Sequence, residues 1–146
     1  MQHTEKGNIY TEIVLEVFKL SGLLVADGDR LVKHIGLTSA RWKVLGALSI
    51  ADGSMTVSKI AENMGQSRQG VQRIVNDMIR EGMVICHENP HHKRAKLIVM
   101  TEKGQTTYQA LNELQVPWAN EKAEKIGIED MQRTLKTLQQ MTQFLK

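Results

Sequence analysis

Apolar residues recur at every third or fourth position along much of this chain, a spacing that is typical of amphipathic helices. One such stretch covers residues 9–35, and we expect Gly22 and Gly28 either to kink this helix or to split it. Another covers residues 128–145, where the apolar side chains are again spaced by threes and fours. The pattern therefore predicts a mainly helical protein with a helix near each end.

Two further helices are predicted from residues that favour helix starts. Thr38 is placed to cap a helix in which Leu37 and Trp42 occupy hydrophobic staple positions. A later helix begins after Thr101. Pro117 interrupts it, because proline cannot donate a hydrogen bond to the carbonyl four residues earlier. We therefore expect a kink or a break at Pro117.

The segment from Thr56 to Met83 predicts two short helices joined by a sharp turn. Thr56 caps the first helix, Gly65 allows the turn, and Ser67 caps the second helix. The apolar side chains of the second helix fall on one face, which leaves a polar face outward. The outward residues are Arg68, Gln69, Gln72, Arg73 and Asn76. Arginine binds guanine, and Gln or Asn binds adenine, through paired hydrogen bonds in the major groove, so this helix is predicted to read bases.

Beyond Gly82 the spacing of apolar residues changes from helical to extended. Residues 83–87 and 96–100 predict the two strands of a hairpin, and the tip at 88–95 is basic. Such a hairpin suits a minor groove, whose negative potential attracts arginine. Each feature alone is also typical of an ordinary solvated surface. Their order along the chain favours a winged helix-turn-helix that binds duplex DNA.

The positive charge is concentrated on this segment. The chain has 19 Lys and Arg against 16 Asp and Glu, for a net charge of +3. Residues 56–104 hold eight of the basic and five of the acidic residues, so the rest of the chain has eleven of each and is neutral. The whole excess thus lies where DNA phosphates would be met. Three charges bind a polyanion weakly, which favours two copies acting together.

The terminal helices offer a surface for pairing two copies. Their apolar stripes, around Ile9, Ile13, Leu135 and Leu138, either pack on each other within one subunit or pair with a second chain. The amount of apolar helix favours a homodimer. Two reading helices about 34 Å apart would then meet successive major grooves and require a near-palindromic site.

Length and composition limit the class of protein. A chain of 146 residues suits one domain, and 41% hydrophobic content is enough for a core. No apolar run is long enough for a membrane span or a secretory signal, so we expect a cytoplasmic protein. Cys86 is the only cysteine, which excludes an intrachain disulfide. Its apolar strand context favours an inert core position over a redox sensor.

Other functions fit the sequence less well. No constellation typical of an enzyme is present, and Gly65–Gly70 lacks the Lys-Ser/Thr pair of a phosphate loop. A winged helix that binds only protein would present a neutral or apolar outward face. Zinc sensing is suggested by Cys86–His87 and His91–His92. Neighbours in a strand point to opposite sides, however, and cannot easily bind one ion together, so we predict no metal and no other cofactor.

Three motifs, in order and at matching spacing, connect this chain to a known family. They are Gly36-Leu37-Thr38-x-x-x-Trp42-x-x-Leu45, the helix-turn-helix from Thr56 to Met83, and a wing ending His92-x-Arg94 that is followed by Met100-Thr101-x-x-Gly104. With them the chain resembles the MarR family of bacterial transcriptional regulators over essentially its whole length. The resemblance implies a mainly α fold with a small β-hairpin wing (α+β).

The resemblance also implies an organisation and a function. It implies one domain over residues 1–146, in which 9–35 and 105–146 are dimerisation helices and 37–104 is the DNA-binding lobe. The expected protein is a homodimeric repressor that binds double-stranded DNA at a pseudo-palindromic operator. A small aromatic or phenolic effector often releases such repressors from DNA.

Specific residues receive roles from these arguments. The predicted DNA contacts are Ser67, Arg68, Gln69, Gln72, Arg73, Asn76, His92, Lys93 and Arg94. The residues that correspond to the family's ligand pocket are His34, Arg41 and Trp42. The family usually has Asp two residues before the wing arginine, where this chain has His92. Protonation of His92 would add positive charge at the DNA surface.

Overall fold

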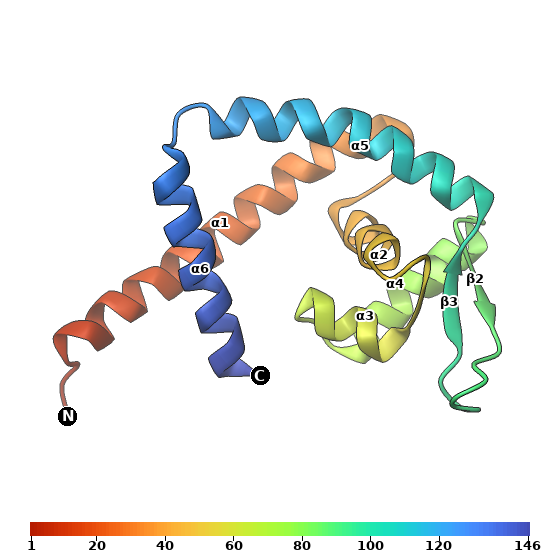
Figure 1. Cartoon of the computed structure of the whole chain (residues 1–146), viewed down its shortest axis with the longest axis horizontal. Coiled ribbons are helices and arrows are strands. Elements are labelled where there is room, and N and C mark those ends of the chain that lie inside the picture. Colours follow the sequence, from red (N-terminus) through yellow and green to blue (C-terminus); the bar gives the residue numbers. More distant parts are fainter. The chain divides into compact units, whose positions relative to one another are not determined.

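The computed structural model describes all residues from Met1 to Lys146, which divide into two units, Met1–Asn112 and Glu113–Lys146. The mainly helical fold with a small antiparallel sheet confirms the predicted fold class (Figure 1). The elements are α1 (Glu5–Val32), η1 (Lys33–Ile35), α2 (Ser39–Ile50), β1 (Ser54–Thr56), α3 (Val57–Met64), α4 (Arg68–Arg80), β2 (Val84–His87), β3 (Leu97–Met100), α5 (Glu102–Ala123) and α6 (Ile128–Leu145).

The core of the first unit lies between α2, α3, α4 and the sheet. Leu45 and Leu48 of α2, Ile60 of α3, and Val75 and Met78 of α4 have no exposed surface. Aliphatic and methionine side chains thus fill this core, in keeping with the 4% aromatic content of the chain. Their burial fixes which faces of α3 and α4 remain outward.

The predicted helix starts of the helix-turn-helix are confirmed. Thr56 Oγ1 accepts the backbone N–H of Lys59, and Ser67 Oγ accepts that of Gly70, so each side chain caps its helix. Gly65 ends α3 with a φ of 63°, a left-handed conformation that glycine adopts without strain. The turn between α3 and α4 therefore follows directly from local sequence.

The sheet has three strands in the order β1-β3-β2, all antiparallel. The hairpin of β2 and β3 is as predicted, with Cys86 opposite Ile98. Strand β1, which pairs Met55 with Ile98, was not predicted, because three residues are too few to show an alternating pattern. The wing is therefore joined to the start of α3 through a shared sheet.

Neither of the two helices in which a kink or a break was expected is broken. Helix α1 runs unbroken through Gly22 and Gly28, since one glycine costs only about 1 kcal/mol in a helix interior. Gly28 instead allows close packing, because an added Cβ would lie 2.6 Å from Ser39 Oγ. The predicted break at Pro117 does not occur either, and α5 continues to Ala123. Proline removes one bond to the carbonyl of Glu113, and that residue is exposed and can bind water.

Candidate nucleic-acid interface

The two faces of α4 differ as the sequence predicts. Val71, Val75 and Met78 are buried, and Ile74 and Ile79 are partly buried against the same core. Each of the predicted outward residues, Arg68, Gln69, Gln72, Arg73 and Asn76, is exposed. The helix therefore presents a continuous polar face of two guanidinium and three amide side chains to solvent.

A groove lies between this face and the wing. It has a volume of about 830 Å³ and is lined by the first turns of α3 and α4, by Cys86 of β2 and by the end of the wing loop. Its charged side chains are Arg68, Arg94 and Lys96, and no carboxylate lines it. A concave surface with three cations and no anion attracts phosphate.

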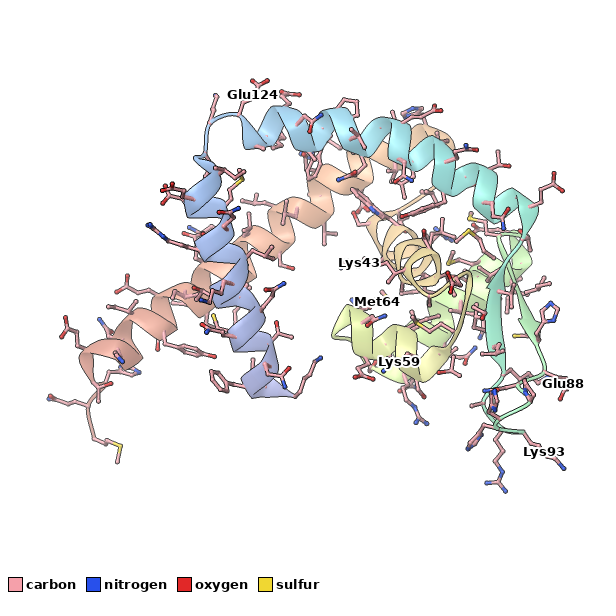
Figure 2. All side chains as sticks on the ribbon, viewed as in Figure 1. Lys43, Lys59, Met64, Glu88, Lys93 and Glu124 are labelled. Atoms are coloured by element: carbon pink, nitrogen blue, oxygen red, sulfur yellow. The ribbon has the colours of Figure 1, made fainter.

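The predicted DNA-contact residues divide between the groove and its surroundings. Five of them line the groove: Arg68, Gln69, Gln72, His92 and Arg94. Arg73 and Asn76 are exposed on α4 outside the lining, and the Ser67 hydroxyl is engaged as the cap of α4. Lys93 lies at the free end of the hairpin, away from the helices (Figure 2). The structure thus brings three of the predicted helix residues and two of the predicted wing residues to one groove.

The wing loop is organised by hydrogen bonds within the loop, two of which are accepted by side chains. Asn89 Oδ1 accepts the N–H of His91 at 3.0 Å, and the Asn89 carbonyl accepts that of His92 at 3.2 Å. His92 Nδ1 accepts the N–H of Ala95 at 3.2 Å. His92 therefore takes an acceptor role in the loop, one that a carboxylate at this position would also be able to take.

Several groove residues were missed by sequence reasoning. Thr56, Ser58 and Lys96 line it, and the prediction of a buried Cys86 is wrong because this residue is exposed in the groove. Cys86 lies opposite the buried Ile98 of the central strand β3, but β2 is an edge strand and its residues after Val84 are exposed. The alternation of residues along the strand shows which side chains share a face of the sheet. It does not show which positions on that face are buried.

The three predicted ligand residues do not line this groove. Arg41 forms an ion pair with Glu81, in which Nη2 lies 2.5 Å from Oε1. Trp42 is partly buried and packs on the core, where it approaches Gly28 of α1. His34 is exposed in η1. Arg41 and Trp42 are thus already engaged in contacts between helices.

Two findings bear on the other sequence hypotheses. No three or more His, Cys, Asp or Glu side chains lie together as a group able to hold a metal ion. None of the helices combines the length and the apolar character that crossing a membrane requires.

Comparison with known proteins gives a matching family model and several relatives. The MarR family model matches residues 35–95. An uncharacterized protein of Mycobacterium tuberculosis is 36% identical over 134 residues, which cover 92% of each chain. The transcriptional activatory protein BadR of Rhodopseudomonas palustris is 28% identical over 145 residues, which cover 97% of this chain and 82% of BadR.

Solved structures share the fold. AbsC, a MarR family regulator from Streptomyces coelicolor, has a TM-score of 0.82 at 22% identity, over 99% of this chain and 97% of AbsC. M. tuberculosis MosR in complex with DNA has a TM-score of 0.76 at 23% identity, over 91% and 97%. The organohalide-sensing regulator RdhR with 2,4-dichlorophenol bound has a TM-score of 0.81 at 18% identity, over 99% and 86%. With its winged helix-turn-helix and the polar face of α4, this chain belongs to the MarR family of DNA-binding transcriptional regulators.

Proposed function

We propose that this protein is a homodimeric repressor that binds a pseudo-palindromic operator through α4 and the wing. The observation that carries the proposal is the groove between them, which joins base-reading amides to three cations and contains no carboxylate. In this proposal Arg68, Gln69, Gln72, Arg73 and Asn76 contact bases in the major groove. His92, Lys93 and Arg94 reach the adjacent minor groove, and Ser67 contacts the backbone.

Dimerisation is supported by the apolar surface of the terminal helices. In α1 only Gly28 and Val32 are buried, whereas Leu15 is 61% and Phe18 69% exposed. In α6 no residue is buried, although its apolar side chains are spaced for one stripe. A second copy covering these faces would remove large apolar side chains from water and double the number of phosphate contacts.

A small aromatic effector is the second part of the proposal. Neighbours of the same fold support it, since RdhR is solved with 2,4-dichlorophenol bound. The candidate contacts are His34, Arg41 and Trp42. An effector that binds better to a conformation unfit for the operator lowers the affinity of the protein for DNA. By thermodynamic linkage, bound DNA lowers the affinity of the protein for the effector by the same factor.

The test begins with selection of bound duplexes from a genomic fragment library, followed by affinity measurements on the preferred duplex. Arg73→Ala should weaken binding by about 1–3 kcal/mol and relax the base preference, if its contact is bidentate. Arg94→Ala should weaken binding while the major-groove preference stays. Arg30→Ala, which removes the same charge from α1, is the control and should have little effect.

Two outcomes would contradict the proposal. Equal binding of the wild-type protein to every duplex would exclude an operator-specific regulator. Repression would be excluded if the selected sites lay away from promoters and the protein did not change expression of a reporter gene. Activation of the reporter would instead place this protein with regulators such as BadR.

A further inference from the structure

The turn between α4 and β2, Glu81–Met83, is bound to α2 by the side chain of Arg41, which does not line the groove. Arg41, in the first turn of α2, donates from Nη2 to Glu81 Oε1 at 2.5 Å. Glu81 is the residue that caps the C-terminal end of α4. The end of the reading helix is thus fixed to α2 by a contact between residues 40 positions apart in the sequence.

The same turn is held from its other side by the start of α5. Lys103 Nζ donates to the Glu81 carbonyl at 2.6 Å, and Thr101 Oγ1 donates to the Gly82 carbonyl at 2.6 Å. Because α4 precedes this turn and the wing follows it, both reading elements are fixed at one point.

The first turn of α2 is also bound to α1. Asp29 Oδ1 accepts the backbone N–H of Ser39 at 2.6 Å, and the Ser39 hydroxyl donates to the Val25 carbonyl at 2.9 Å. Ser39 is the one polar residue of the chain that is buried. Two residues further on, Arg41 holds the end of α4. One helical turn therefore connects α1 to the reading elements.

The burial of the Arg41–Glu81 pair distinguishes it from the surface ion pairs. The Arg41 side chain is 21% exposed, and its Nε is buried without a hydrogen-bond partner. The guanidinium therefore depends on Glu81 for its compensation, and a partly buried charge that loses its partner is costly. By contrast, the Arg30–Asp27 pair lies within one helix and its arginine is 72% exposed, so it joins no two elements.

We propose that Arg41 is a positioning residue for DNA recognition, which through Glu81 holds α4 and the wing at a fixed angle to α1. The inference rests on the proposed function, in which α1 pairs two copies. The angle then decides whether both reading helices meet successive major grooves. Binding to phosphates alone does not require the two reading helices to meet successive major grooves. Loss of Arg41 should therefore lower affinity for the preferred duplex more than affinity for duplexes in general.

The experiment compares Arg41→Gln with Arg30→Gln, which removes the same charge from an exposed pair. Each variant is titrated with the preferred duplex and with a scrambled duplex of the same length. Amide hydrogen exchange of residues 81–84 is measured on the free proteins. Arg41→Gln should lose at least tenfold in affinity for the preferred duplex and less than twofold for the scrambled one. It should also speed exchange at residues 81–84, and Arg30→Gln should do neither.

Two further variants keep the test decisive if Arg41→Gln does not fold. Glu81→Gln keeps a side-chain oxygen that can accept from Arg41 but removes the negative charge. This variant should lose about threefold in affinity for the preferred duplex. The charge swap, Arg41→Glu with Glu81→Arg, should recover part of the affinity that Arg41→Glu alone loses. A merely structural contact would lower affinity for both duplexes together.

Equal losses for both duplexes, unchanged exchange in Arg41→Gln, or no recovery in the swap would overturn the inference. Failure of the proposed function is separately visible, because the wild-type protein would then prefer no duplex. The exchange measurement uses no DNA, so it still decides in that case whether Arg41 holds the turn.

Discussion

Gln72 and Asn76, one helical turn apart on the exposed face of α4, share a hydrogen bond in which Gln72 Nε2 donates to Asn76 Oδ1 at 2.9 Å. One amide hydrogen and Oε1 of Gln72 remain free. These are the two groups that pair with N7 and N6 of adenine. Asn76 therefore fixes the direction of an amide that is otherwise free to rotate.

We expect Gln72 to select adenine at one position of each half-site, with Asn76 as its support. Asn76→Ala should reduce this preference severalfold, and Gln72→Ala should abolish it, while preferences at other positions remain. Selection from a randomised duplex library measures both effects. Asn76→Asp keeps the accepting oxygen and should therefore keep the adenine preference, while its added negative charge lowers affinity for every duplex. Retention of the adenine preference in Gln72→Ala would remove this residue from base reading.

Placing a charge on the apolar stripe of α6 tests the dimer. Leu135 is 58% exposed in the single chain, so Leu135→Asp should disturb the subunit little but place a buried charge in a dimer interface. Sedimentation equilibrium should then find monomers, with loss of operator binding. Gln140→Asp, on the opposite face of α6 by helical spacing, should remain dimeric. A wild-type monomer at micromolar concentration would contradict the model.

The close approach of α5 to the turn before β2 predicts the effect of a single methyl group. A Cβ at Gly104 would lie 2.2 Å from the Met83 carbonyl oxygen, so Gly104→Ala should destabilise the fold by about 1–3 kcal/mol. Gly46 in α2 has no atom within 4 Å of such a Cβ, and Gly46→Ala should stabilise by about 0.5–1 kcal/mol. Urea unfolding of both variants is the measurement, and equal effects would refute this packing argument.

A phenolic effector should report itself through tryptophan fluorescence. Trp42 and Trp118 are the only tryptophans, so the fluorescence of the protein comes mainly from these two residues. An effector is indicated if phenolic acids quench this fluorescence saturably and release labelled operator over the same concentration range. Trp42→Phe should remove the signal if the ligand binds beside α2. A broad panel of compounds that changes neither fluorescence nor DNA binding would leave a regulator without this input.

The sequence predicted the parts of the fold that depend on neighbouring residues. The caps Thr56 and Ser67 and the turn at Gly65 each need only a few adjacent residues, and the apolar stripe of α4 selects its outward face. The groove residues Arg68, Gln69 and Gln72 could therefore be named in advance.

The remaining features depend on contacts between distant residues. Gly28 is a packing position because Ser39 lies against it, and Arg41 holds Glu81 because α2 crosses the end of α4. Neither relationship has a local pattern. The exposure of Cys86 likewise depends on the place of β2 at the edge of the sheet, which is set by pairing with distant residues. Single-sequence reasoning thus identifies faces of elements better than it identifies their partners.

Thr56 is both the last residue of β1 and the cap of α3, so no linker separates the sheet from the helix-turn-helix. One residue inserted after Thr56 would turn α3 by about 100° relative to the sheet and carry its apolar face out of the core. The wing loop between His87 and Leu97 has no comparable constraint on its length. Insertions or deletions in the wing loop can therefore change the contacts with an operator without disturbing the core. The spacing between β1 and α3 cannot vary in this way.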